Sequence, residues 1–205
     1  MDKINLFNEI SNHLMNDDKP SKYLNELMQE NKIKTNKIKS IFKLKQIEQN
    51  PKYHPEGDVW QHTMMVIDEA SKIKHKSKDS KVLMWAALLH DIGKITTTRI
   101  RKGRITSYEH DFVGAKLTKD ILSDLTENQD FIEKVSILVK YHMHTFYINK
   151  NLPFGDLRGL KRDVDLEELA LLSLSDRLGR AELNEEGKKE IFKFIEDFKK
   201  KMHNI

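Results

Sequence analysis

Histidine and aspartate residues recur in this chain where the surrounding sequence is apolar. Nine histidines occur among the 205 residues, and ionisable side chains are seldom buried unless a partner or a metal ion compensates them. The clearest case is the pair His90-Asp91, which follows the apolar run 82–89. Taken alone, this pair favours a hydrogen-bonded structural role over a metal site or a catalytic pair.

Other histidine and aspartate residues in the chain favour a metal site over a structural role for this pair. Three more histidines and a second aspartate stand in apolar or helix-terminal surroundings: His62, His110, His142 and Asp176. Imidazole nitrogens and carboxylate oxygens bind first-row transition metals and Mg²⁺ or Mn²⁺. Each residue by itself fits a hydrogen-bonded core group, but the six together predict a site for a divalent metal. His144, two residues further on, is an alternative to His142.

The elements that must position these residues are helices in almost every case. Apolar residues spaced three to four apart predict helices at 3–15, two short ones that begin near 20 and 35, and further ones at 58–74, 79–93, 109–122, 127–141, 166–178 and 185–201. Asp2, Thr35 and Asp58 are suited to N-cap positions. A short β-hairpin or ordered loop is expected near 96–108, around Lys102-Gly103, and a loop with one helical turn at 151–159. We therefore expect an all-α domain.

Composition restricts the class of protein. Hydrophobic residues make up 38% of the chain and charged residues 33%, which indicates a soluble, globular protein with one domain. The absence of cysteine excludes disulfides, thiolate zinc sites and cysteine nucleophiles, and it fits a reducing cytoplasm. The sequence shows neither a membrane-spanning apolar run nor a signal-peptide core, so we expect a cytoplasmic protein that does not contact membranes. Its oligomeric state is open.

The charge distribution points weakly to a polyanionic partner. Basic residues exceed acidic ones by 36 to 32, which gives a net charge of +4. Six lysines crowd one early segment, which we call the 32–45 lysine face: Lys32, Lys34, Lys37, Lys39, Lys43 and Lys45. This face is a candidate contact for RNA, although a solvated helix surface is the simpler explanation.

Five segments resemble the HD domain of bacterial CCA-adding tRNA nucleotidyltransferases, within the HD superfamily of metal-dependent phosphohydrolases. They are 53–63 (YHPEGDVWQHT), 88–94 (LLHDIGK), 109–115 (EHDFVGA), 140–142 (KYH) and 175–180 (SDRLGR). The resemblance implies an HD-domain helical bundle at 51–205 with a helical N-terminal extension at 1–50. Those enzymes also carry a polymerase head, whose motifs are missing here, so we expect no nucleotide-adding activity.

The resemblance also implies a role for each ligand. A first metal ion would be held by four residues: His62, His90, Asp91 and Asp176. His110 and His142 resemble the histidines that support a second ion in bimetallic members, with Asp91 as the bridge; otherwise they contact the phosphate or donate a proton to the leaving oxygen. The expected cofactor is one or two divalent ions, and Mn, Ni, Co, Fe, Mg and Zn all remain open.

Catalytic and substrate-binding roles follow from the same resemblance. Four residues are expected to act in catalysis: His90, Asp91, Lys94 and His110. Three cations are expected to contact the substrate phosphate, with a structural contact as the alternative for each: Lys94, Arg158 and Arg177. Asp58 is expected to cap its helix rather than bind metal, because it lies a full turn before His62.

The expected activity is that of a phosphomonoesterase or phosphodiesterase acting on a nucleotide or an RNA end. Metal-bound water would attack phosphorus, and the resemblance makes 2′,3′-cyclic phosphates and 2′-nucleotides the first substrates to consider. A hydrolase of signalling nucleotides or dinucleoside polyphosphates is the alternative enzyme. The alternative outside enzymes is an RNA-binding module that keeps a structural metal.

Overall fold

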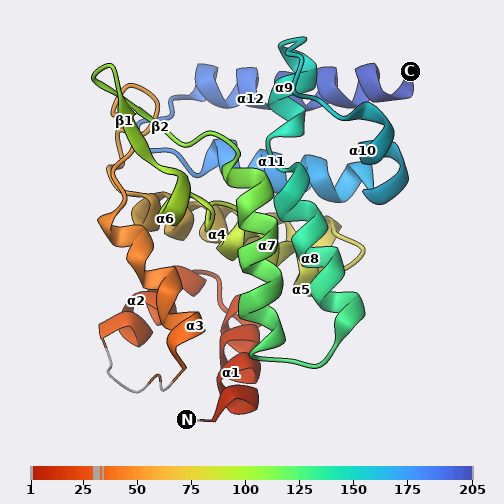
Figure 1. Ribbon diagram of the computed structural model, residues 1–205. Helices are drawn as coiled ribbons and strands as arrows, with labels where there is room; N and C mark the ends of the chain where they lie inside the picture. The colour runs from red at the N-terminus through yellow and green to blue at the C-terminus, as the bar shows by residue number, and fades with distance from the viewer. Residues whose placement is uncertain (1, 30–32, 34, 205) are drawn as a thin grey trace.

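The computed structural model describes residues 2–29, 33 and 35–204, and helices dominate it (Figure 1). The α-helices are α1 Lys3–Asn16, α2 Pro20–Gln29, α3 Asn36–Lys39, α4 Val59–Ile73, α5 Ser80–Leu89, α6 Lys94–Thr97, α7 His110–Ser123, α8 Gln129–Tyr141, α9 His144–Asn149, α10 Leu157–Asp163, α11 Leu166–Leu178 and α12 Glu185–His203. The described chain also contains the 3₁₀ helices η1 Ser40–Gln46 and η2 Lys74–Lys76, and the strands β1 Arg99–Arg101 and β2 Arg104–Thr106. The expected all-α architecture with one short hairpin is confirmed.

Side-chain caps set the start of several helices. Asp2 and Asp58 each accept a hydrogen bond of 2.8 Å from a backbone N–H in the first turn of α1 and α4, as expected of N-caps. Asp79 does the same for α5 at 3.2 Å. Thr35 occupies the N-cap position of α3 as expected, but its hydroxyl donates to Asp124 and α3 begins without a side-chain cap hydrogen bond.

The structure is more helical between α8 and α11 than the sequence pattern predicted. The loop expected at 151–159 gives way at Leu157 to α10, whose N-terminus is capped by Asp156. The short helix α9 was not predicted at all. Both helices are too short for an apolar period of 3.6 residues to stand out in the sequence.

Helix α5 forms the centre of the core. Residues 82–89 are all buried, and α5 packs against α1, α4, α8 and α11. Fully burying a large apolar side chain stabilises a fold by about 1.5–3 kcal/mol. Burial of this one helix therefore contributes much of the hydrophobic stabilisation of the core. No helix among the described residues has both the length and the apolarity needed to cross a membrane.

The N-terminal helices share this core. Phe7 of α1 stacks on Trp85 of α5 with ring centroids 5.2 Å apart, and the indole N–H of Trp85 donates to Ser11 over 3.0 Å. In the same way Trp60 of α4 donates to Asn25 of α2 over 2.8 Å. The division of the chain at residue 50 stays a prediction, but α1 and α2 are packed on the helices that follow it.

The hairpin stands at the edge of the molecule, beyond α6 (Figure 1). Strands β1 and β2 pair antiparallel, with Ile100 opposite Ile105. Lys102 and Gly103 form the connection with positive φ angles of 49° and 72°, the backbone that a tight two-residue hairpin turn requires. The hairpin predicted around these two residues is therefore confirmed.

Candidate metal centre

The predicted ligands come from the ends of five helices that meet at one place. His62 lies in the first turn of α4, His110 is the first residue of α7, and Asp176 lies in the last turn of α11. His90 directly follows α5, and His142 directly follows α8. All four histidines are buried. The structure thus brings together side chains that are widely separated in the sequence.

Helix α5 ends at Leu89, earlier than the expected end at Gly93. The chain then turns, with hydrogen bonds from Ile92 N to Leu89 O and from Lys94 N to Asp91 O. Adjacent side chains on a regular helix point about 100° apart, whereas this turn directs both His90 and Asp91 into the interior, where they are 1% and 3% exposed. The early end of the helix is therefore what allows both residues to face one site.

Gly93 allows α7 to approach this turn. A Cβ atom at position 93 would lie 2.0 Å from the carbonyl oxygen of His110 and 2.7 Å from the amide nitrogen of Gly114. Only a residue without a side chain fits there. The close approach places His110 Nε2 3.3 Å from Asp91 Oδ1.

Three histidines are oriented by the same kind of hydrogen bond. The Nδ1 atoms of His90, His110 and His142 lie 2.7–2.8 Å from backbone carbonyl oxygens three residues earlier in the chain. A carbonyl only accepts, so each Nδ1 carries a hydrogen and each neutral ring presents its Nε2 lone pair to the interior.

Asp91 lies between these rings. Its Oδ2 atom is 3.3 Å from His90 Nε2, and its Oδ1 atom is 3.3 Å from His110 Nε2 and 3.8 Å from His142 Nε2. Lys94 donates to Oδ2 over 2.7 Å and to the Gln49 side chain over 2.8 Å. Burial would raise the pKa of Asp91, but the positive charge of Lys94 and the contacts with His90 and His110 hold it well below its usual range. Asp91 is therefore an ionised carboxylate.

His62 joins the cluster next to His90, with the ring centroids 5.5 Å apart. Its Nε2 atom lies 3.0 Å from Asp176 Oδ1, and its Nδ1 atom lies 3.1 Å from Gly179 O and 2.9 Å from Glu56 Oε1. Burial favours the neutral ring, but hydrogen bonds to Asp176 and Glu56 outweigh it and raise the pKa of His62 to about 9. The pKa of Asp176 is held well below its usual range, because contact with His62 outweighs the effect of burial.

The donor atoms fit divalent metal ions. His62, His90 and Asp91 offer three donor atoms that all lie within 4.8 Å of one another, and Asp91, His110 and His142 offer a second such set. The Nε2 atom of His90 is buried and makes no hydrogen bond, although Asp91 lies nearby. A buried lone pair without a donor is costly, and a cation would satisfy it.

Arg158 and Arg177, two of the predicted phosphate contacts, have surroundings that differ from those of Lys94. Arg158 is exposed on α10. Arg177 places its guanidinium 3.5 Å from the centre of the Phe194 ring of α12, and burial lowers the pKa of Arg177 to about 10. Their proposed contact with substrate stays a prediction. The alternative ligand His144 is fully buried, beside Tyr141 at 4.7 Å between ring centroids.

Sequence reasoning missed two residues that support the cluster. Glu56 contacts both His54 and His62, at 2.8 and 2.9 Å, and is almost fully buried. Gln49 accepts a hydrogen bond from Lys94. Glu56 lies inside the segment that resembles the HD domain, so the resemblance contained its signal. Gln49 lies in an irregular stretch without any such pattern.

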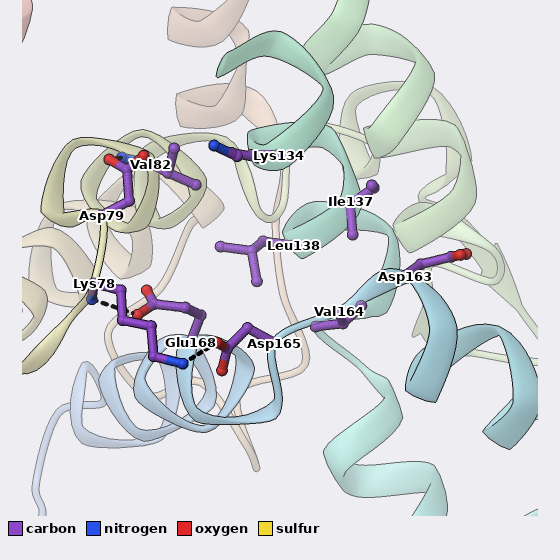
Figure 2. Close-up of a pocket in the computed structure, with 10 residues that line it drawn as sticks. All are labelled: Lys78, Asp79, Val82, Lys134, Ile137, Leu138, Asp163, Val164, Asp165 and Glu168. Carbon is purple, nitrogen blue, oxygen red and sulfur yellow. Dashed lines mark hydrogen bonds and ion pairs between the residues drawn. The ribbon is translucent and has the colours of Figure 1, made fainter. Parts of the chain in front are cut away.

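A cavity of about 390 Å³ lies elsewhere, between α5, α8 and the start of α11 (Figure 2). None of the predicted ligands or phosphate contacts lines it. Lys78 binds Asp165 through its ammonium group and Glu168 through its backbone N–H. Lys134 and Asp163 pair with Asp130 and Arg162, which do not line the cavity. The charged side chains that line this cavity are therefore engaged in ion pairs or hydrogen bonds.

Comparison with known proteins assigns the family. The model of the HD domain matches residues 59–181, a stretch that includes all six clustered residues, and the chain belongs to this family. HD-domain proteins are in general metal-dependent phosphohydrolases. The described His and Asp cluster provides side chains that could hold the ion.

The chain is also similar to parts of curated bacterial proteins named multifunctional CCA protein. The protein of Cupriavidus metallidurans is 30% identical over 150 residues, which cover 73% of this chain and 34% of that protein. The proteins of Pseudomonas fluorescens and Actinobacillus pleuropneumoniae serotype 5b are 31% and 30% identical over 138 and 98 residues, covering 66% and 48% of this chain. The alignments span 23–34% of these three relatives. The resemblance to the HD domain of CCA-adding enzymes is thereby confirmed.

Proposed function

We propose that this chain hydrolyses phosphate esters on a nucleotide or an RNA end, using two divalent metal positions that share Asp91. The observation that carries the proposal is the placement of Asp91: its two carboxylate oxygens face different histidines, His90 on one side and the pair His110 and His142 on the other. A buried carboxylate between two sets of imidazole donors matches the requirement of a bridging ligand.

The first position would be formed by four side chains: His62, His90, Asp91 and Asp176. The second would be formed by Asp91, His110 and His142. Bound ions supply a Lewis acid for the phosphoryl oxygens and a nucleophile derived from water at neutral pH. Glu56 and Gly179 fix the orientation of the His62 ring. Hydrogen bonds of this kind affect how strongly a histidine binds a metal ion.

Lys94 is the proposed phosphate contact nearest the cluster. Its ammonium group forms an ion pair with Asp91 over 2.7 Å. A metal ion beside Asp91 would repel this ammonium, and the flexible lysine side chain would then be free to bind an incoming phosphate. Arg158 and Arg177 are further proposed contacts for the substrate phosphate.

Similarity to CCA proteins supports a substrate with a nucleotide or an RNA end. We propose 2′,3′-cyclic phosphates and 2′-nucleotides as the preferred substrates. The metal is proposed to be Mn, Ni, Co, Fe, Mg or Zn, because imidazole and carboxylate ligands accept all of these ions.

The proposal is tested with purified chain and 2′,3′-cyclic AMP, 2′-AMP and an aryl phosphate, each assayed with Mn²⁺, Ni²⁺, Co²⁺ and Mg²⁺. We expect turnover of at least one substrate and its loss in His90→Ala, while His75→Ala, an exposed histidine outside the cluster, keeps full activity. No turnover with any metal, or full activity in His90→Ala, would contradict the proposal.

The same assay, extended to dinucleoside polyphosphates and signalling nucleotides and accompanied by an RNA-binding measurement, separates the alternatives. Turnover confined to dinucleoside polyphosphates or signalling nucleotides would leave the reaction class standing and change the substrate. RNA binding that persists in His90→Ala, without hydrolysis by the unaltered chain, would favour an RNA-binding module with a structural metal.

A further inference from the structure

The hairpin beside the metal centre carries the most concentrated unpaired positive charge in the described chain. Four cations lie within six residues: Arg99, Arg101, Lys102 and Arg104. All four are exposed, and no carboxylate among the described residues lies within ion-pair distance of them. The whole chain has 36 basic and 32 acidic residues, so the four hairpin cations equal its formal excess. A polyanion would find these charges uncompensated.

The 32–45 lysine face offers less unpaired positive charge than the hairpin. Lys37 pairs with Asp120 over 2.6 Å, and Lys32 and Lys34 lie outside the described residues. Lys39, Lys43 and Lys45 are exposed. The hairpin therefore replaces this face as the better candidate for nucleic-acid contact.

The base of the hairpin is tied to the metal centre. Helix α6 begins at Lys94, which binds Asp91, and leads directly into β1. On the other side, Ser107 follows β2, and its carbonyl oxygen lies 2.8 Å from His110 Nδ1. The Thr98 and Ser107 hydroxyls close the base with a hydrogen bond of 2.8 Å. A strand of three residues spans about 10 Å, and the hairpin stands at the edge of the molecule (Figure 1), so its cations extend outward from the site.

Exposed aromatic and apolar side chains accompany the charge. Tyr108 is 64% exposed, and the Arg101 guanidinium lies 5.0 Å from the centre of its ring. Ile100 on β1 is 76% exposed. On the loop that holds His54, Tyr53 is 56% exposed with Lys52 5.6 Å from its ring. Proteins usually bind single-stranded nucleic acid with cations that contact its phosphate backbone and with aromatic rings on which its bases stack.

We propose that the hairpin Arg99–Thr106 together with Tyr108 binds the strand of a single-stranded RNA whose phosphorylated end enters the metal centre. Arg99, Arg101, Lys102 and Arg104 bind backbone phosphates, and Tyr108 stacks on a base near the end. The proposal rests on the proposed phosphohydrolase function and narrows its substrate from any nucleotide to an oligonucleotide. A mononucleotide in the metal centre is too short to use the hairpin.

The test compares two substrates with the same reacting group: 2′,3′-cyclic AMP and a single-stranded oligoribonucleotide that ends in a 2′,3′-cyclic phosphate. The variant is the triple charge reversal Arg101→Glu, Lys102→Glu and Arg104→Glu. Its matched control reverses three exposed charges on the other basic segment: Lys39→Glu, Lys43→Glu and Lys45→Glu. The measured quantity is kcat/KM for the oligonucleotide divided by kcat/KM for the mononucleotide.

We expect this ratio to fall at least about tenfold in the hairpin variant and to stay within about twofold in the control. The salt dependence of oligonucleotide binding should become shallower by a slope of about 2, from about 0.7 per lost phosphate contact. Tyr108→Ala should weaken oligonucleotide binding by about tenfold, the effect of losing one stacked base. An equal fall in the control, or an unchanged ratio in the hairpin variant, would overturn the proposal.

Binding measured by fluorescence anisotropy separates this inference from the proposed function. If the unaltered chain hydrolyses neither substrate, the proposed function fails, and weaker RNA binding in the hairpin variant alone would still support the RNA contact. If the mononucleotide is hydrolysed but RNA of any length binds both variants equally, only the hairpin proposal fails. Preferential binding to anionic vesicles over RNA would also overturn it. Thermal unfolding of each variant checks that the fold is kept.

Discussion

His110 and His142 face each other through their Nε2 atoms, which lie 3.1 Å apart. The Nδ1 atom of each ring contacts a backbone carbonyl, so two neutral rings would oppose their lone pairs. Burial lowers the pKa of His142 to about 3, and this ring does not supply the missing proton at neutral pH. A metal ion, which the neighbouring Asp91 would help to hold, would relieve this contact.

His142→Ala should therefore remove one of the two proposed metal ions and leave the other. His62 and His90 do not depend on His142 for their orientation, so the first position should stay filled. Metal analysis of protein purified without chelators measures the stoichiometry directly. His75→Ala serves as the control, and an unchanged metal content in His142→Ala would exclude this residue as a ligand.

Removing the metal should destabilise the protein. A ligand present at a hundred times its dissociation constant adds about 2.7 kcal/mol to the free energy of unfolding, and about 2–4 °C of Tm per kcal/mol is typical for a chain of this length. We expect chelation to lower Tm by about 5–10 °C, as measured by calorimetry. The shift should be smaller in a variant that combines His62→Ala with His90→Ala, because only the second position, formed by Asp91, His110 and His142, would remain. An equal shift in that variant would show that the stabilising ions bind elsewhere.

The metal-free protein should lose stability between pH 6.5 and 9. The pKa of His62 is raised to about 9 in the folded chain, against about 6.5 when unfolded. Its stabilising contribution is therefore fully present below pH 6.5 and disappears as the pH rises through 9. The loss is on the order of 3 kcal/mol.

Denaturant unfolding in the presence of chelator, repeated at several pH values, measures this loss. His62→Gln should flatten the profile over the same range. The same linkage predicts that metal binding releases a proton from His62, so metal affinity should rise with pH up to about 9. Affinity that does not change with pH would show that His62 is not a ligand.

Lys94→Met should separate phosphate binding from metal binding. Losing a charged hydrogen bond to phosphate costs about 1.5–3 kcal/mol, so kcat/KM should fall by about ten- to a hundredfold. Metal affinity should stay the same or rise, because the ammonium that now neutralises Asp91 competes with the ion. Calorimetric metal titration beside steady-state kinetics measures both effects. Loss of metal binding in parallel with activity would show that Lys94 only supports the cluster.

Gly93→Ala should damage the site through packing. The added methyl group would meet the His110 carbonyl at 2.0 Å, and overpacking of this kind typically costs about 1–3 kcal/mol. We expect a lower Tm and weaker binding of the second metal. Gly155→Ala is the matched control, since its nearest neighbour would be 3.6 Å away. Equal effects of the two substitutions would show that Gly93 has no special role.

The sequence predicted the long helices well because their apolar spacing repeats over several turns and because Asp2, Asp58 and Asp79 provide strong caps. Helix α9 was missed and α10 was predicted only as one turn within a loop, because each contains fewer than two turns. Thr35 was expected to cap α3, but the distant Asp124 competes for its hydroxyl, and no local pattern reports such a partner.

The meeting of the six candidate ligands could be anticipated because each stands out against apolar neighbours. The residues that hydrogen-bond to the site residues were harder to predict. Glu56 and Gln49 lie in an irregular segment, where a buried carboxylate or amide resembles an exposed one. The pairing of Arg177 with Phe194 likewise depends on how α12 packs against α11, which local spacing does not determine.

His62 and Asp176 are hydrogen-bonded although 114 positions separate them, and their partners come from three other helices. Such a site cannot form in a partly folded chain, because nearly every helix around it must already be in place. Metal ions should therefore bind after the rate-limiting step of folding. Their presence should slow unfolding and leave the refolding rate nearly unchanged. The ions would therefore stabilise a structure that folds without them.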